Sequence, residues 1–256
     1  MSESFLIAGI LSISGGLQDA YTYMYRGKVF ANAQTGNIVL LAQNLVDRNW
    51  QAALRYFSPL LFFALGVAMA ECIRMKYQKA QKIHWRQLVL VMEIVLLFAV
   101  GFFPNEMDLL ANAMVSFACA MQVQAFRKVN GYAFASTMCI GNLRSGMESL
   151  CAYGKTKDKK ILQKSGYYFG IIFLFAIGAA LGGHMIKYIG AKTIWISCLI
   201  LLISFLCMFI KEEKKEHPEI AEEEQEIRDN LKNIRKEAKD VEHILEDDIR
   251  SQIEKK

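Results

Sequence analysis

Eight apolar or partly apolar segments follow one another along the first 210 residues of the chain. They cover residues 5–25, 29–46, 53–73, 88–103, 107–126, 133–153, 166–186 and 193–210. A helix needs about 20 apolar residues to cross a hydrocarbon core about 30 Å thick, and six of the segments meet this requirement. The pattern therefore predicts an all-α transmembrane protein.

Two of the eight segments differ from the others in polarity. Segment 29–46 opens with a polar half that contains a glycine, and segment 133–153 carries Arg144 and Glu148 in its middle. A charge at the centre of a bilayer costs at least about 2.5 kcal/mol on insertion scales. We therefore expect six spanning helices, with these two segments as re-entrant or broken helices.

The two halves of the chain resemble each other. The run DAYTYMYRGKVFANAQTGN begins at Asp19, and QAFRKVNGYAFASTMCIGN begins at Gln124. An offset of 105 aligns Ala20 with Ala125, Gly36 with Gly141, and Asn37 with Asn142, and further along Gly66 corresponds to Gly178. Internal repeats are common in transporter folds. The sequence predicts two repeats, at about 5–103 and 107–210.

Charged residues are distributed unevenly between the apolar part and the C-terminal end. Residues 1–210 hold 19 Lys+Arg and 9 Asp+Glu, a net charge of +10. Residues 211–256 hold 11 and 16, a net charge of −5, and the two parts sum to the chain's +5. A stretch so apolar and so poor in charge is not a water-soluble domain. We expect a membrane domain over 1–210 and a charged helical cytoplasmic tail over 211–256.

The tail carries a narrow apolar stripe on an otherwise charged sequence. Its members recur at steps of three and four, at Ile227, Leu231, Ile234, Ala238, Val241 and Leu245. This spacing favours a homo-oligomeric coiled coil through residues 220–253. A single solvated helix, or one that packs on the cytoplasmic loops, is the alternative.

Basic residues fix the expected orientation in the membrane. They cluster at 74–86 and at 155–164, and positively charged loops remain in the cytoplasm. The two clusters fall on one face only if segment 133–153 dips into the membrane and returns. Repeat symmetry then makes segment 29–46 dip from the other face, which gives two inverted repeats with both termini in the cytoplasm. A parallel arrangement of four plus four spanning helices is the alternative.

Polar residues inside the apolar segments are the candidates for a solute site. Each Gly-Asn pair precedes a helical run, so free backbone N–H groups and polar side chains would point into the protein. The predicted substrate-binding residues are Asp19, Gln34, Thr35, Gly36, Asn37, Gly141 and Asn142. The alternatives are helix-packing glycines and an interfacial Asp19 paired with Arg26 or Lys28. Arg144 and Glu148, four residues apart, are a possible gate or structural ion pair.

Enzyme chemistry, metals and cofactors have no basis in the sequence. It contains no phosphate-binding loop, no nucleophile elbow, no cluster of metal ligands, and no Cys-x-x-Cys pair among its six cysteines. The basic loops are short and adjoin membrane segments, so anionic lipid accounts for them better than nucleic acid does. We expect no enzyme, cofactor, metal site or nucleic-acid partner.

The runs GGLQDAYTY at 15–23 and FANAQTGNIVLLA at 30–42 resemble the N-terminal signature of the YoaK-like family of bacterial multi-pass membrane proteins. The resemblance covers about residues 5–210 and implies a location in the inner membrane. Family members often have a Thr-Gly-Thr-Leu-like run where this chain has Ile140 to Leu143, so the resemblance supports Asn37 more than Asn142. It supplies no substrate.

The function that these features favour is a small-solute transporter or channel, with the lipid bilayer and an unknown small solute or ion as partners. It would work by binding and alternating access at a polar site between the repeats. The alternative is a membrane-embedded scaffold or sensory protein that recruits partners through its C-terminal helix.

Overall fold

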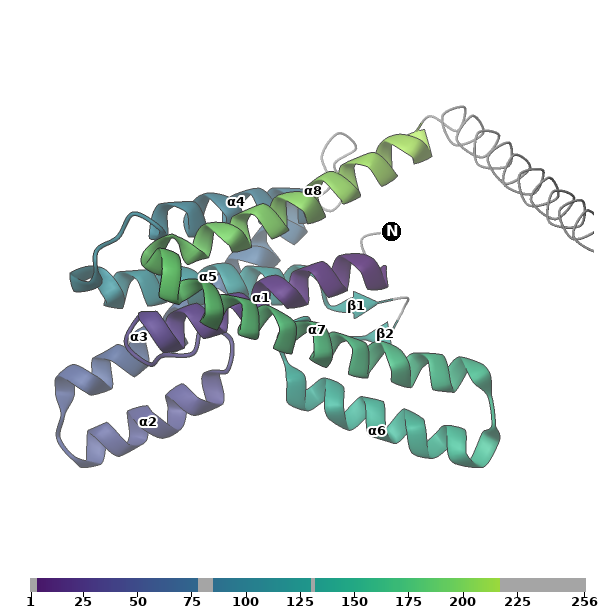
Figure 1. The fold of residues 1–256 in the computed structure, drawn as a ribbon, viewed down its shortest axis with the longest axis horizontal. Helices are drawn as coiled ribbons and strands as arrows, with labels where there is room; N and C mark the ends of the chain where they lie inside the picture. The colour runs from purple at the N-terminus through teal and green to yellow at the C-terminus, as the bar shows by residue number, and fades with distance from the viewer. Residues whose placement is uncertain (1–3, 78–84, 130–131, 217–256) are drawn as a thin grey trace, which may run out of the picture. The chain divides into compact units, whose positions relative to one another are not determined.

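The computed structural model describes residues 4–77, 85–129 and 132–216, and this part of the chain is almost entirely helical (Figure 1). The elements are α1 (Phe5–Tyr25), α2 (Gln34–Val46), α3 (Trp50–Tyr77), α4 (Trp85–Val100), η1 (Asn105–Met107), α5 (Asp108–Ala125), β1 (Lys128–Val129), β2 (Tyr132–Ala133), α6 (Cys139–Thr156), α7 (Lys159–Ile189), η2 (Gly190–Thr193) and α8 (Ile194–Glu216). The chain divides into one unit over 1–208 and another over 209–256. The tail stripe at 220–253 lies outside the described residues.

Each of the two polar segments contains one continuous helix that begins after a non-helical stretch, and we call them the interrupted segments. Segment 29–46 becomes helical only at Gln34, and the 13 residues of α2 extend about 20 Å, which is less than a bilayer core. Segment 133–153 becomes helical only at Cys139. A short antiparallel hairpin of β1 and β2, in which Lys128 pairs with Ala133, precedes α6 and was not predicted from the sequence.

Within the described residues, two helical stretches are long and apolar enough to cross a membrane. They are Trp50–Tyr77, which is α3, and Lys159–Met208, which runs through α7 and η2 into α8. The other predicted spans are shorter or more polar: α4 has 16 residues and α5 has 18.

Large apolar side chains cover the outside of the helices. On α3 they follow one face at steps of three and four, at Leu54, Phe57, Leu61, Leu65 and Met69, and α8 exposes Leu199, Leu202, Ile203 and Leu206. A continuous apolar surface of this kind is unfavourable in water and suits the hydrocarbon of a bilayer.

Two long helix pairs form the centre of the fold. α1 packs against α7 and α3 packs against α5, while α2 lies on α3 and α6 lies on α7 (Figure 1). Glycines permit the close approach. A methyl group added at Gly178 of α7 would overlap the carbonyl oxygen of Ile13, and one added at Gly66 of α3 would overlap that of Phe117 on α5.

Contacts along the helices give their relative directions. Near its C-terminal end α1 is followed by Arg26, which pairs with Asp108 at the start of α5, whereas Leu11 accepts a hydrogen bond from Gln122 near the end of α5. The two helices are therefore antiparallel. α1 and α7 are parallel instead, because Phe5 stacks on Tyr167 near the start of both helices and Tyr25 adjoins Gly190 after the end of α7.

Arg26 joins three segments beneath the end of α1. Its fully buried guanidinium donates to Asp108 Oδ1 at 3.0 Å and to the hydroxyl of Tyr21 at 2.8 Å. It also donates to the carbonyl oxygens of Val100, Phe103 and Pro104. Because a buried charge is tolerated only when it is paired and fully hydrogen-bonded, this network fixes α1 to the turn between α4 and α5.

Candidate functional site

One face of α1 carries a line of buried polar side chains. Its members are Ser12, Ser14, Gln18, Asp19 and Thr22, each at most 7% exposed. Ser14, Gln18 and Thr22 are four residues apart, so they lie above one another along the helix. In a membrane domain such groups face the protein interior, because hydrocarbon offers them no partner.

Gln18 is at the centre of a polar cluster that joins four helices. Its Nε2 lies 3.0 Å from Ser14 Oγ, 2.9 Å from Ser197 Oγ on α8 and 3.2 Å from Glu93 Oε1 on α4. An amide nitrogen has two hydrogens, so these three acceptors share them. The thiol of Cys119 on α5 donates to Gln18 Oε1 at 2.6 Å.

Glu93 is the buried acid of this cluster. Its side chain is fully buried, and its Oε2 has no hydrogen-bond partner in the described part of the chain. No role was predicted for Glu93 from the sequence. A carboxylate inside the apolar run from Trp85 to Val100 was the signal that could have identified it.

Asp19 holds the first interrupted segment against α1. Its Oδ1 accepts the backbone N–H of Asn32 at 2.7 Å, and Asn32 Nδ2 donates to the carbonyl oxygen of Gly15 at 3.3 Å. Arg26 pairs with Asp108 instead, and Asp19 forms no ion pair within the described residues. The ion pair of Asp19 with Arg26 or Lys28 is therefore not formed, and a backbone N–H takes its place.

The second interrupted segment reaches the same point of α1. A methyl group added at Gly15 would overlap Thr137 Cγ2. Gln122 Nε2 of α5 donates to Ser136 Oγ at 3.1 Å. The residues before α2 and those before α6 thus meet at Gly15 and Asp19, which we call the loop junction.

Two buried polar atoms at the loop junction have no hydrogen-bond partner within the described residues. They are Asn32 Oδ1 and Thr137 Oγ1, one from each interrupted segment. Together with the Asp19 carboxylate, they provide acceptors and a hydroxyl donor beside α1. This arrangement is chemically suited to bind a polar or cationic group.

Asn37 and Asn142 each form hydrogen bonds inside their own segment. Asn37 Nδ2 donates to the carbonyl oxygen of Phe30 at 2.7 Å and to Gln34 Oε1 at 2.8 Å, and its Oδ1 accepts the N–H of Phe30. Asn142 Nδ2 donates to the carbonyl oxygen of Ala135 at 2.7 Å. We expected both side chains to point into the protein as part of a solute site, and in the structure each closes the turn that precedes its helix.

Comparison with known proteins agrees with the sequence resemblance. The pattern of a family described as a protein of unknown function, DUF1275, matches residues 7–207. The chain belongs to the DUF1275 family. It is similar to the UPF0700 transmembrane protein YoaK of Bacillus subtilis (strain 168), with 25% identity over 185 residues that cover 68% of this chain and 80% of that protein. No solved structure matches the chain.

The family and the apolar helix surfaces together identify a membrane protein. The DUF1275 match contains the Gln18 cluster and the loop junction, and it ends before the charged tail. The resemblance to the YoaK-like family is therefore confirmed.

The other predicted binding residues take no part in the contacts of the loop junction described above. Gln34 Nε2 donates to the carbonyl oxygen of Ala31 at 2.7 Å, Thr35 is exposed, and Gly36 packs beside the ring of Phe30. Gly141 is exposed, and an added methyl group there would meet nothing within 4 Å.

The predicted ion pair of α6 is not formed. Arg144 and Glu148 are both exposed, and neither belongs to an ion pair within the described residues. Arginine placed before glutamate is the less favourable order for an i,i+4 pair on a helix, and solvent competes for both charges. Their positions give no support to a gate.

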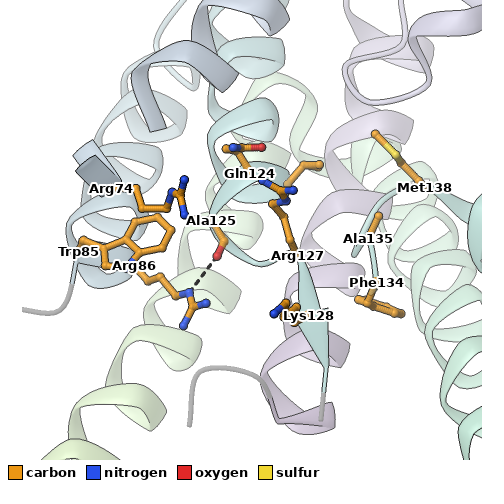
Figure 2. Close-up of a pocket in the computed structure, with 11 residues that line it drawn as sticks. Arg74, Trp85, Arg86, Gln124, Ala125, Arg127, Lys128, Phe134, Ala135 and Met138 are labelled. Atoms are coloured by element: carbon orange, nitrogen blue, oxygen red, sulfur yellow. Dashed lines mark hydrogen bonds between the residues drawn. The ribbon is translucent and has the colours of Figure 1, made fainter. Parts of the chain in front are cut away.

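A basic cavity of about 820 Å³ lies where α3 and α5 end and α4 begins (Figure 2). It is lined by Arg74, Trp85, Arg86, Val123, Gln124, Ala125, Arg127, Lys128, Phe134, Ala135 and Met138. Four of these side chains are cationic and none is acidic. Met138 lies between Thr137 and Cys139, and Ala135 precedes Thr137 by two residues, so one wall of this cavity belongs to the second interrupted segment.

Proposed function

We propose that this chain is a multi-pass transporter or channel for a small solute in the inner membrane. The observation that carries the proposal is the loop junction. Asn32 Oδ1 and Thr137 Oγ1 are buried there without a partner in the described residues, beside the Asp19 carboxylate. Leaving such a group unpaired costs about 1–3 kcal/mol, so we expect water or a solute to supply the missing hydrogen bonds.

Equivalent packing in the two halves supports an internal repeat. Gly66 of α3 approaches the carbonyl oxygen of Phe117 on α5, and Gly178 of α7 approaches that of Ile13 on α1. Ile13 and Phe117 are 104 positions apart, which is close to the offset of 105 between the Gly-Asn pairs. The third helix of each half therefore packs against the first helix of the other half: α3 against α5, and α7 against α1.

Helix directions favour inverted repeats over parallel ones. Eight full crossings would make α1 and α5 parallel, because three further crossings would separate them. The contacts of Arg26 with Asp108 and of Gln122 with Leu11 make these helices antiparallel. Six crossings, with α2 and α6 returning to the face from which they enter, give this direction and leave both termini in the cytoplasm.

In this proposal the two interrupted segments are the moving parts. Asp19 binds a cation, a proton or a polar group of the solute, and Asn32 and Thr137 contribute one wall each. Because each wall belongs to a different repeat, a rocking of one repeat against the other opens the junction to one face and then to the other. The chemistry is binding and release, with no covalent step.

The decisive experiment measures water access to the junction. In a variant in which all six native cysteines are replaced by alanine, Thr137→Cys is treated with a membrane-impermeant, positively charged thiosulfonate in intact cells and in inside-out vesicles. A thiol reacts through its thiolate, which forms only where water reaches it. We expect modification at Thr137→Cys, and none at the control Leu201→Cys, whose position is fully buried among apolar side chains.

Two outcomes would contradict the proposal. If Thr137→Cys stays unreactive from both faces, the junction is a sealed core, which favours the scaffold alternative. The second outcome concerns Asp19→Asn, which keeps the shape and removes the charge. Reconstituted protein is tested for currents evoked by Na⁺, K⁺, protons, amino acids and organic acids, and an Asp19→Asn protein with all wild-type currents would exclude a coupling role for this carboxylate.

A further inference from the structure

The basic cavity of Figure 2 is separate from the chemistry proposed for the loop junction, and the transport proposal does not use it. Its cationic side chains come from three places in the chain. Arg74 lies in the last turn of α3, Arg86 lies in the first turn of α4, and Arg127 and Lys128 follow α5. Like charges repel when gathered in one cavity, so the cluster is most stable when an anion lies among them.

Glu71 is the acidic neighbour of the cavity, and its carboxylate is already occupied. It pairs with Arg74 and accepts the Gln124 Nε2 hydrogen at 2.7 Å. These bonds hold Arg74 and Gln124 on the wall, and the charge of Glu71 offsets that of Arg74. Arg127 and Lys128 belong to no ion pair within the described residues, so at least two positive charges of the lining remain.

The cations differ in how firmly they are held. Arg86 donates from Nε to the carbonyl oxygen of Ala125 at 2.9 Å, and its guanidinium lies 5.2 Å from the centre of the Trp85 ring. The side chains of Arg127 and Lys128 are exposed and take part in no ion pair within the described residues. Arg86 is thus held in one orientation, whereas the side chains of Arg127 and Lys128 can adjust to a ligand.

The walls between the charges are apolar. Trp85, Val123, Phe134 and Met138 line the cavity together with the cations. A small inorganic ion would leave these surfaces unused, whereas an organic group attached to an anion would cover them. Arginine and lysine together are suited to phosphate, which accepts paired N–H donors and carries up to two charges.

We infer that this cavity binds a phosphate group borne by an organic molecule, either an anionic phospholipid or a soluble phosphate ester. The ligand's phosphate lies against Arg127, Lys128 and Arg86, and its organic part lies against Trp85 and Met138. The inference is independent of transport, since a bound phosphate ligand would be present whether the loop junction conducts a solute or not.

The test uses the full-length protein in a non-ionic detergent and isothermal titration calorimetry. The probes are dioctanoyl phosphatidylglycerol, glycerol 3-phosphate, inorganic phosphate, and dioctanoyl phosphatidylcholine as the zwitterionic control. The test variant is Arg127→Gln with Lys128→Gln. The matched control is Lys155→Gln with Lys159→Gln, which removes the same charge from exposed positions outside the cavity lining.

We expect saturable binding of at least one phosphate ester, and a loss of about tenfold or more in affinity only in the Arg127 and Lys128 variant. Binding of phosphatidylglycerol alone identifies a lipid site, and binding of glycerol 3-phosphate as well identifies a soluble ester. The variant Ala135→Leu, which fills the cavity without changing charge, should weaken binding too. Equal losses in both charge variants, or no binding of any ester, would overturn the inference.

Discussion

Asn37 and Asn142, 105 positions apart, make the same hydrogen bond. Each donates from Nδ2 to the carbonyl oxygen of the residue seven positions earlier, Phe30 or Ala135, at 2.7 Å in both cases. The asparagine side chain donates to a backbone carbonyl oxygen that has no partner within a helix. An extended segment can therefore lead directly into a helix inside the protein without leaving this carbonyl group unpaired. Both asparagines thus stabilise the turns that carry the residues of the loop junction.

Replacement of these asparagines should therefore reduce stability in proportion to the bonds they make. Asn37→Ala removes two donated bonds and one accepted bond, whereas Asn142→Ala removes the one described bond to Ala135. With a penalty of about 1–3 kcal/mol for each buried group left unpaired, Asn37→Ala should be the more damaging change. Reversible unfolding in detergent mixtures measures both. Gly141→Ala is the control, and a loss there as large as that of Asn142→Ala would refute this account.

The close contact of α1 with α7 should not tolerate a side chain at Gly178. Gly178→Ala places a methyl group against the backbone carbonyl of Ile13, which cannot move without displacing α1. Overpacking of this kind costs about 1–3 kcal/mol or more, and we expect a marked fall in the yield of monodisperse protein by size-exclusion chromatography. Gly166→Ala, in the same helix with nothing within 4 Å of the added methyl group, should leave the yield unchanged. Equal yields from the two variants would contradict the packing.

The hydrogen bonds of Arg26 predict that replacing Arg26 destabilises the protein more than replacing its ion-pair partner Asp108. Arg26→Gln removes the charge and most of the donors that serve Asp108, Tyr21 and three carbonyl oxygens, so we expect a loss of about 3–5 kcal/mol in unfolding free energy. Asp108→Asn leaves the carbonyl partners in place and should cost less. Lys28→Gln, at an exposed neighbouring position, serves as the control. If Asp108→Asn lowers the unfolding free energy more than Arg26→Gln does, the ion pair stabilises the turn, and the hydrogen bonds to the three carbonyl oxygens do not.

The proposed topology predicts which loops are accessible from outside the cell. In the cysteine-free variant, Gly154→Cys should resist a membrane-impermeant maleimide in intact cells and react after the membrane is opened. Asn105→Cys, in the exposed turn before α5, should react in intact cells. Labelling of Gly154→Cys in intact cells would contradict the inverted repeats and favour the parallel arrangement.

Hydrophobic pattern predicted the helices of this protein well, and it singled out the two segments in which the helix begins late. Segment 133–153 stood out because Arg144 and Glu148 would be costly in hydrocarbon, and the helix there does begin late, at Cys139. The pairing of Gly66 with Gly178 also came from sequence alignment alone, and both glycines lie at equivalent helix contacts. These features depend on local composition and spacing, which a single sequence carries.

The contacts within the site depend on distant residues and were not predictable in the same way. Asp19 had two nearby cations in sequence, yet its partner is the backbone N–H of Asn32, and Arg26 turns instead to Asp108, 82 residues away. Glu93 stands out in the sequence as a carboxylate among apolar residues, but its hydrogen-bond partner Gln18 comes from another helix and could not be predicted. Thr137 has no distinctive sequence context, because its position against Gly15 arises from the fold.

The pairing of α1 with α7 sets the order of events when the protein is made. α1 ends at Tyr25 and is the first helix to leave the ribosome, while α7 begins only at Lys159. Throughout that interval the face of α1 that carries Ile13 and Gly16 has no native neighbour. The first half therefore cannot complete its packing before the second half is made. A chain that stops before Lys159 would leave this face of α1 uncovered.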